Sequence, residues 1–268
     1  MNQIFSRNSG YIDADTQQKI FKSKILIAGC GIGSQIALAA ARMGIHHFVL
    51  VDGDEVELTN LNRQAYSYND VKKYKTEALK EKLLEINPQI NIQCFSTYLN
   101  HENARKIVEL CDIVIDTIDF LDLPAILELH HQANILGKPV LSGFSAGWGC
   151  ALVYAQPNPN KPSLISEIFN IKQMGNLSYV EVFKNFFKKL VGHLPEAVQN
   201  DMNQVLIKMQ DNQPCPASHV ISGTLCLAAL ANTALYQIIK GQSTMHSEMI
   251  LIDLEKMISM PGIVLTDS

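Results

Sequence analysis

The sequence predicts an α/β protein with a doubly wound sheet, and three observations carry this prediction. Short β-branched runs end in acidic residues or glycine, a glycine-rich loop separates the first run from an alanine-rich helix, and three prolines introduce a polar helical stretch after the sheet. Ligand-binding groups gather at the carboxyl ends of strands in such sheets. We therefore expect a parallel N-terminal half, a mixed C-terminal half and a helical insert.

Strands and helices alternate in the predicted N-terminal half. The apolar runs Lys24–Ala28 and His47–Asp52 are typical of buried strands, and an alanine-rich helix, Gln35–Met43, lies between them. This order predicts a right-handed crossover with parallel strands. The amphipathic pattern Lys75–Ile86, which Asn87-Pro88 ends, predicts a second helix. Two further strands are predicted at Ile90–Phe95 and Asp112–Asp116.

The C-terminal half changes character after two predicted strands, Pro139–Gly143 and Cys150–Ala155. Prolines 157, 159 and 162 end the sheet region, and residues 164–211 have the pattern of polar helices. We predict an insert there rather than a separate domain. A mostly apolar helix, His219–Lys240, and a last strand, Glu248–Leu254, then return to the core.

Composition limits the partners and the compartment. The 268 residues are 47% hydrophobic and carry a net charge of −4, with an isoelectric point near 6.1, which argues against nucleic acid as the main partner. The six cysteines form no Cys-x-x-Cys pair, so they indicate no zinc ribbon or disulfide framework and suit a reducing compartment. The polar N-terminus lacks the apolar core of a signal peptide, and no apolar run reaches the length of a membrane span. We expect a cytoplasmic protein.

The first functional signal is a glycine-rich loop, Gly29-Cys-Gly31-Ile-Gly33, between a predicted strand and a predicted helix. Glycines there let the backbone approach a ligand closely, and a helix N-terminus offers unpaired N–H groups to an anion. Asp52 and Asp54 follow 23 and 25 residues after Gly29, about where a Rossmann carboxylate meets ribose hydroxyls. The pattern predicts a nucleotide site, although by itself it would serve a dehydrogenase equally well.

The most informative segment, Thr59-Asn-Leu-Asn-Arg-Gln64, follows the second strand without a hydrophobic period. The guanidinium of Arg63 can bind phosphate oxygens through two parallel N–H groups, and flanking amides such as that of Asn60 can donate further hydrogen bonds to them. Lys75 begins a helix twelve residues later, where its ammonium can return to the same phosphates. These groups suit a triphosphate, whereas a dehydrogenase has no evident use for them. The basic run just before Lys75 fits a solvated surface better.

An ordered set of motifs now spans the N-terminal half: the glycine loop, Asp52-x-Asp54, Asn60-Leu-Asn-Arg63-Gln64, Lys75, Ile86-Asn87-Pro88 and Asp116-x-x-Asp119. This set resembles the ubiquitin-activating-enzyme-like adenylyltransferase superfamily, and most of all its bacterial ThiF/MoeB type. The resemblance runs from about Phe5 to Ser145 and returns weakly over Cys215–Gly241. Each motif alone is weak, but their order and spacing together are specific.

The resemblance implies an ATP-dependent nucleotidyltransferase. In that superfamily a small ubiquitin-like sulfur carrier ends in Gly-Gly, and its terminal carboxylate attacks the α-phosphorus of ATP, so that an acyl-adenylate forms and pyrophosphate leaves. By similarity Asp54, supported by Asp52, holds the ribose. Asp119 binds magnesium, a hard cation that takes a carboxylate and phosphate oxygens, and Asp116 supports its loop. The implied phosphate ligands are Asn60, Arg63 and Lys75.

Two more residues are assigned by the resemblance. Phe5-Ser-Arg-Asn8 is similar to the Arg-Gln or Arg-Asn pair near the start of these proteins. The resemblance implies that Arg7 reaches the γ-phosphate bound by the other subunit of a homodimer, as an arginine finger. The alternative is a disordered N-terminal arginine. Cys215 lies where many relatives carry a cysteine before the last core helix, and some relatives use it to form a thioester or persulfide. Such a nucleophile needs a thiolate. His219 either activates it or packs against the helix.

The chain also departs from the superfamily. Pro162–Phe169 lacks the first of the two Cys-x-x-Cys pairs that bind zinc in many relatives, so no zinc is expected. Phe120 follows Asp119 where relatives often have Asn. Phenylalanines and lysines at 183–189 predict an amphipathic helix packed on its own domain, with a partner contact as the alternative.

The sequence is expected to divide into four segments. These are an N-terminal arm with the candidate arginine finger at 1–22, an ATP-binding Rossmann-like region at 23–163, a helical insert or crossover loop at 164–214, and a C-terminal helix and strand at 215–268 that complete the same domain.

Several functional alternatives stay open. The substrate is either a ubiquitin-like carrier or another C-terminal carboxylate, such as that of a peptide. A tRNA threonylcarbamoyladenosine dehydratase shares the nucleotide motifs, but it would want a basic surface for RNA. A non-catalytic nucleotide-binding subunit is a further alternative, against which Arg63, Lys75 and Asp119 argue. A nicotinamide-dependent dehydrogenase would leave Arg63 and Lys75 unexplained. We expect ATP and Mg²⁺ as cofactors, with neither nucleic acid nor a membrane as partner.

Overall fold

The computed structural model describes residues 3–171, 178–211, 218–241 and 249–260. At its centre is a seven-stranded sheet in the order β3-β2-β1-β4-β5-β6-β7. The strands from β3 to β5 are parallel, β6 pairs antiparallel with β5, and β7 pairs antiparallel with β6. This confirms the predicted fold class. The strands are β1 Lys24–Ala28, β2 His47–Val51, β3 Asn91–Phe95, β4 Ile113–Asp116, β5 Val140–Ala146, β6 Gly149–Ala155 and β7 Met249–Asp253.

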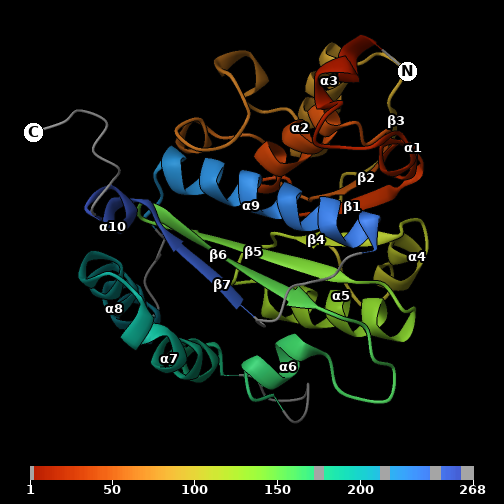
Figure 1. The fold of residues 1–268 in the computed structure, drawn as a ribbon. Helices are drawn as coiled ribbons and strands as arrows, with labels where there is room; N and C mark the ends of the chain where they lie inside the picture. Colours follow the sequence, from red (N-terminus) through yellow and green to blue (C-terminus); the bar gives the residue numbers. More distant parts are fainter. Residues whose placement is uncertain (1–2, 172–177, 212–217, 242–248, 261–268) are drawn as a thin grey trace, which may run out of the picture.

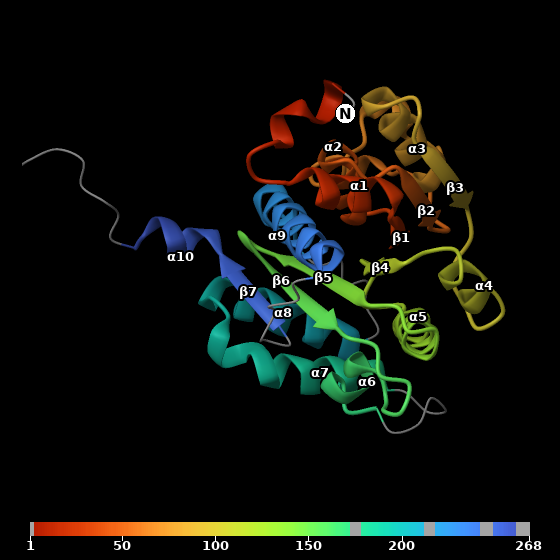
Figure 2. The same ribbon diagram turned by 45° about the vertical axis from the view of Figure 1, so that its right-hand side comes forward.

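Helices cover both faces of the sheet, as a doubly wound fold requires (Figures 1 and 2). One face carries α1 Ala14–Lys22, α2 Gly33–Met43, α3 Lys75–Ile86 and α9 Ile221–Lys240, and the other carries α4 Ala104–Val108 and α5 Leu123–Ile135. The insert adds α6 Leu164–Ile168, α7 Tyr179–Leu190 and α8 Glu196–Gln210 beneath β5, β6 and β7, and α10 Leu254–Ile258 follows β7. Short 3-10 helices are η1 Gln3–Asn8, η2 Leu58–Asn60, η3 Tyr68–Asp70 and η4 Val191–His193.

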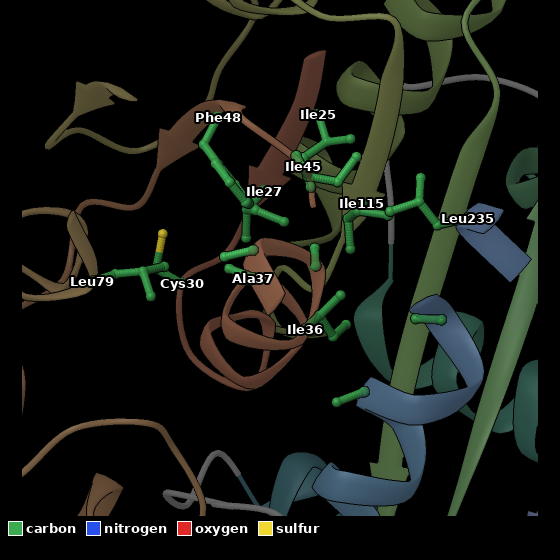
Figure 3. Close-up of a cluster of buried hydrophobic side chains, with 14 of the residues drawn as sticks. Ile25, Ile27, Cys30, Ile36, Ala37, Ile45, Phe48, Leu79, Ile115 and Leu235 are labelled. Carbon is green, nitrogen blue, oxygen red and sulfur yellow. The ribbon is translucent and has the colours of Figure 1, made fainter. Parts of the chain in front are cut away.

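The central strands are buried on both faces, which explains their uninterrupted apolar sequence. Along β1, Ile25 and Ile27 belong to the core under α2 and α9, while Leu26 and Ala28 belong to the core against α4 and α5. Figure 3 shows Ile25 and Ile27 within the first of these cores. Fully burying one such aliphatic side chain contributes about 1.5–3 kcal/mol. The two cores fix the strand ends, and therefore the residues that follow them.

Helix α9 is the longest element and returns the chain to the core. Among the described residues it is the one helix that has the length and composition to cross a membrane. It packs against α2, β5 and β6, where Leu227, Ala231 and Leu235 are buried. Asn232 Nδ2 donates to Ile36 O at 3.1 Å and joins α9 to α2. Gly241 ends the helix in the left-handed conformation, with φ +79°, as the sequence predicts.

The helical insert is attached by an aromatic cluster around Phe120. The ring centroid of Phe120 lies 5.4 Å from those of Phe169 and Phe183 and 5.8 Å from that of Phe186. On α7 the phenylalanines are buried, whereas the lysines at 184, 188 and 189 are exposed. This confirms the amphipathic helix packed on its own domain. Because Phe120 follows Asp119, the insert is packed directly against the loop after β4.

Some elements were not predicted from the sequence. Helix α5 is buried over most of its surface, so its sequence lacks a polar face with a helical period. Helix α4 has only five residues, and α1 lies in the segment that we expected to be an N-terminal arm. Strand β5 continues three residues beyond its predicted end at Gly143, because each of these residues pairs with β6.

Candidate active site

The loop between β1 and α2 lies very close to the loop after β4. Gly29 has φ +88°, and a Cβ on it would lie 2.4 Å from Thr117 O. Gly33 leaves room for Thr117 Oγ1, which donates to Gly29 O at 2.6 Å. Ile32, the N-cap of α2, supplies no side-chain hydrogen bond to the first turn. Ser34 N and Gln35 N donate to the carbonyls of Gly31 and Ile32, so the backbone itself closes the first turn of α2.

Hydrogen bonds join the glycine loop to the polar segment that follows β2. Ser34 Oγ accepts from Ala65 N at 2.9 Å, and a Cβ on Gly31 would lie 3.2 Å from Gln64 Nε2. The hydroxyl of Tyr66 lies 2.6 Å from Cys30 O and 3.1 Å from the carbonyl oxygen of Lys75. The loop and the start of α3 are therefore held in one arrangement.

The side chain of Asp52 links the glycine loop to the end of β2 through hydrogen bonds. Its Oδ2 accepts from Cys30 N at 2.7 Å, and its Oδ1 accepts from Asp54 N at 2.8 Å. Burial raises the pKa of Asp52, and the charge of Lys75 opposes this rise. Both oxygens are engaged by the backbone, which suits the supporting role predicted for this residue.

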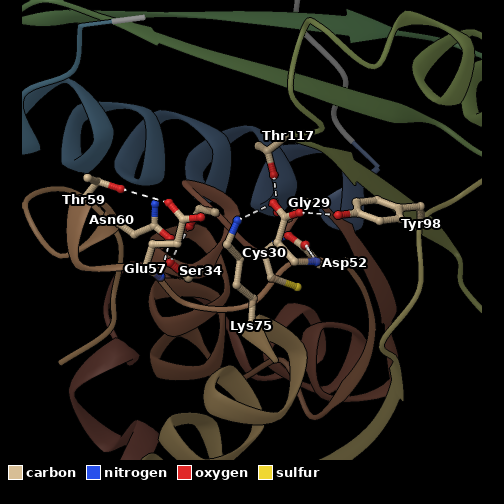
Figure 4. Close-up of polar contacts among 12 residues, drawn as sticks. Gly29, Cys30, Ser34, Asp52, Glu57, Thr59, Asn60, Lys75, Tyr98 and Thr117 are labelled. Atoms are coloured by element: carbon tan, nitrogen blue, oxygen red, sulfur yellow. Dashed lines mark hydrogen bonds and ion pairs between the residues drawn. The ribbon is translucent and has the colours of Figure 1, made fainter. Parts of the chain in front are cut away.

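Asp54 is held by two side chains (Figure 4). Lys75 Nζ lies 2.7 Å from Oδ2, and the hydroxyl of Tyr98 donates to Oδ1 at 2.7 Å. Although burial opposes it, these hydrogen bonds lower the pKa of Asp54 below its ordinary value. Lys75 is only 7% exposed, so its ammonium is committed to this site rather than to the solvent.

Arg63 lies in the turn after η2. Its backbone N–H donates to the carbonyl of buried Asn60 at 3.2 Å, and its Nη1 donates to Thr59 O at 2.8 Å and Asn62 Oδ1 at 3.0 Å. Arg63 Nε is buried without a hydrogen-bond partner among the described residues. Burial lowers the pKa of Arg63, and the charge of Asp119 opposes this change. The side chain is half-buried, and the N–H groups of a guanidinium suit an anionic ligand.

The two acidic residues at the end of β4 have different environments. Asp116 is buried, its Oδ2 accepts from Ser142 Oγ at 2.9 Å, and His130 Nε2 lies 3.0 Å away. Asp119 is exposed, and its Oδ1 accepts from Leu121 N at 3.0 Å. Asp116 is thus engaged inside the protein, whereas Asp119 is exposed to solvent.

A third carboxylate, Asp122, belongs to this group. Burial raises its pKa, and the charges of Asp119 and Asp54 add to the rise. Within the described residues no three side chains of the metal-ligating types come together. Magnesium requires only one or two carboxylates when phosphates and water supply the other ligands. The exposed carboxylate of Asp119 fits that requirement.

His219 lies beside this group, two residues before α9. Its carbonyl accepts from Asn62 Nδ2 at 3.1 Å, and its Nδ1 is buried with no partner in the described part of the chain. Burial and the charge of Arg63 lower the pKa of His219, while Asp119 and Asp201 oppose the change. His219 therefore packs against the polar segment after β2.

Two further predicted site residues, Cys215 and Arg7, have different outcomes. Cys215 lies outside the described residues, so its assignment as a thioester- or persulfide-forming nucleophile stays a prediction. Arg7 is exposed in η1, and its neighbour Asn8 donates to Met43 O at 3.1 Å, at the C-terminal end of α2. The glycine loop lies at the other end of that helix.

Sequence patterns missed three contributors to the site. Tyr66 lies just beyond the motif that ends at Gln64, and Thr117 lies between the two acids of the β4 motif, so both positions adjoin visible signals. Tyr98 follows β3 in a loop with no motif, and only the fold brings it to Asp54.

Comparison with known proteins places this geometry in context. The model of the ThiF family matches residues 5–262. The sulfur carrier protein ThiS adenylyltransferase of Escherichia coli K12 is 30% identical over 148 residues, which are 54% of this chain and 58% of that protein. The molybdopterin-synthase adenylyltransferase of Haemophilus influenzae is 32% identical over 162 residues, or 59% of this chain and 66% of that protein. The matches thus span about six tenths of these two relatives.

Solved structures share the fold. A crystal structure of PaaA superposes with a TM-score of 0.66 at 20% identity and covers 91% of this chain and 76% of that one. A structure of E. coli MccB with ATP gives a TM-score of 0.64 at 23% identity, with 88% of this chain and 62% of that one covered. These likenesses establish the common fold.

Proposed function

The chain belongs to the ThiF family, and on this basis we propose that it is an ATP-dependent adenylyltransferase that activates a C-terminal carboxylate. The observations that carry the proposal are that Lys75 is buried against Asp54 just after β2, and that half-buried Arg63 interacts electrostatically with Asp119 in the loop after β4. Two cations and a free carboxylate suit a magnesium-bound triphosphate. A nicotinamide cofactor, whose pyrophosphate binds at the glycine loop, would leave Arg63 and Lys75 without a role.

The chemistry is displacement at the α-phosphorus of ATP. A carboxylate oxygen of the substrate forms a bond to that phosphorus, while the bond to the bridging oxygen of the β-phosphate breaks and pyrophosphate leaves with the electron pair. Arg63 and Lys75 hold the phosphates and neutralise the charge that grows on the leaving group. Asp54 binds the ribose, and Asp119 holds magnesium. The metal, when bound, adds further neutralisation at the phosphates.

The substrate is a small ubiquitin-like sulfur carrier or a peptide. Support comes from the relatives, which are named for ThiS and for molybdopterin synthase, and from MccB, solved in complex with MccA. A cytoplasmic location suits the five described cysteines, which are all free thiols.

The direct test is titration calorimetry of the full chain with ATP and magnesium, beside NAD. We expect ATP binding that depends on magnesium, weakens at least about tenfold in Asp119→Ala, and has no counterpart with NAD. Asp15→Ala, which removes an exposed carboxylate in the first turn of α1, is the control and should bind like the wild type. Binding of NAD alone, or silence with both nucleotides, would overturn the proposal.

We also propose that the active form is a homodimer in which Arg7 completes the site of the other subunit. The eleven residues of α2 span about 16 Å, and Arg7 lies near the end of α2 that is far from the glycine loop. That separation exceeds the reach of an arginine side chain within one chain. A second copy can supply the guanidinium where its own chain cannot.

Mixed dimers of Arg7→Ala and Asp119→Ala chains test this arrangement. Each homodimer carries the same defect in both sites, whereas a mixed dimer contains one intact site and one doubly defective site. We expect the mixed dimer, purified through two different tags, to bind one ATP per dimer with wild-type affinity. No high-affinity site in such a dimer would rule out the trans arrangement.

A further inference from the structure

Tyr98 contacts the predicted ribose carboxylate from a loop that has no nucleotide motif. The loop follows β3, and the side chain is 59% exposed, yet its hydroxyl donates to Asp54 Oδ1 at 2.7 Å. Its carbonyl accepts from Asn103 Nδ2 at 3.0 Å, which fixes the backbone as well. An exposed tyrosine is thus held at both ends next to Asp54.

The ring of Tyr98 also fits closely over Gly53. A Cβ on Gly53 would lie 2.7 Å from Cγ and Cδ2 of the ring. Contacts of that length between carbons do not occur without a shift of one partner. The absence of a side chain at Gly53 therefore allows the close approach of the ring. The ring contact with Gly53 and the hydroxyl contact with Asp54 together fix the position of the Tyr98 side chain.

The two oxygens of Asp54 are divided between two donors. Lys75 engages Oδ2 and Tyr98 engages Oδ1, and Figure 4 labels both donors. An ionised carboxylate has about four acceptor positions, so each oxygen keeps one for a ribose hydroxyl. The hydrogen bond to Asp54 raises the pKa of Tyr98 to about 12, so the phenol keeps its proton and its donor role at neutral pH.

We propose that Tyr98 is a positioning residue that fixes the Asp54 carboxylate for the ribose hydroxyls, so that the site distinguishes ATP from its deoxyribose analogues. The inference rests on the proposed function, because it requires that Asp54 binds the ribose of ATP. With one donor on each oxygen, the carboxylate cannot rotate without breaking a charge-assisted hydrogen bond. The acceptor positions that remain for the ribose hydroxyls then point in fixed directions.

This role differs from a purely structural one in its consequence for ligands. If Tyr98 only covered Gly53, its loss would affect ATP, 2′-deoxyATP and 3′-deoxyATP alike. If Tyr98 orients Asp54, its loss removes an advantage that exists only when the ribose hydroxyls are present. The ratio of the dissociation constants of deoxy analogue and ATP therefore separates the two roles.

The experiment measures magnesium-dependent binding of ATP, 2′-deoxyATP and 3′-deoxyATP to the wild type and to Tyr98→Phe, which keeps the ring and removes the hydroxyl. We expect the wild type to bind ATP more tightly than at least one analogue. In Tyr98→Phe, ATP binding should weaken about tenfold, the scale of a hydrogen bond to a charged group, while binding of that analogue changes little. Tyr68→Phe, at a 75% exposed tyrosine in η3, is the matched control.

A second variant, Gly53→Ala, tests the same inference from the other side of the ring. The added methyl displaces the ring, so discrimination should fall as it does in Tyr98→Phe. An unchanged ratio in both variants, a ratio that rises, or a wild type that binds all three nucleotides equally would overturn the role of Tyr98. A wild type that binds no ATP would instead overturn the proposed function, and this inference with it.

Discussion

Replacing Arg63 with alanine is expected to weaken ATP binding about a hundredfold, the scale of truncating one partner of a desolvated charge pair, while AMP binding changes little. The guanidinium is half-buried and interacts electrostatically with Asp119. The β- and γ-phosphates of ATP would accept hydrogen bonds from its accessible part, whereas AMP lacks these phosphates. Calorimetry with both nucleotides, at a fixed magnesium concentration, measures the difference.

Arg42→Ala is a matched control for this substitution. Arg42 Nη1 donates to Leu38 O, four residues earlier, just as Arg63 Nη1 donates to Thr59 O. Arg42 is exposed near the C-terminal end of α2, away from the site, so its loss should leave both affinities unchanged. Equal losses of ATP and AMP binding in Arg63→Ala would contradict a role in holding the outer phosphates.

Substituting Gly29 with alanine is expected to destabilise the fold by about 3 kcal/mol or more and to abolish nucleotide binding. The positive φ of Gly29 disfavours a side chain, and the new Cβ would lie 2.4 Å from Thr117 O and 2.8 Å from Ile118 N. These atoms belong to the backbone and cannot rotate away. The loop after β4 must therefore move and displace Asp119. Urea denaturation and magnesium-dependent ATP binding measure the two effects.

Gly137→Ala separates the two causes of this loss. Gly137 has φ +68°, but no atom lies within 4 Å of a Cβ placed on it. This variant carries only the backbone strain, about 1 kcal/mol, and should bind ATP normally. If both variants lost the same stability, the close approach of the two loops would not matter, and the explanation given for Gly29 would be wrong.

Much of the fold could be predicted because its signals are local. The buried apolar run of β1 and the amphipathic pattern of α3 match the observed bounds residue for residue. Helix α5 could not be predicted in this way, because a helix buried on most sides has no polar face to set its period. The acids after β2 and β4 were visible because parallel strands present ligand groups at their carboxyl ends.

The remainder of the candidate site depends on contacts between distant segments. Asp54 and Tyr98 are 44 residues apart, and nothing local to Tyr98 marks it as a partner of an acidic residue. Likewise Phe120 appears in the sequence only as a departure from the family pattern. Its ring partners, Phe169, Phe183 and Phe186, lie in a segment that matches no motif. Only the folded chain gives a physical reason for that phenylalanine.

The aromatic cluster around Phe120 has a consequence for substitutions in either of the segments that it joins. The ring of Phe120, next to Asp119, would be exposed to water without the insert. Phe169, which follows α6, and the phenylalanines of α7 would lose a ring contact without Phe120. Phe120 and the rings at 169, 183 and 186 therefore form one packing unit, in which a smaller side chain at any of these positions leaves a cavity next to the loop that carries Asp119.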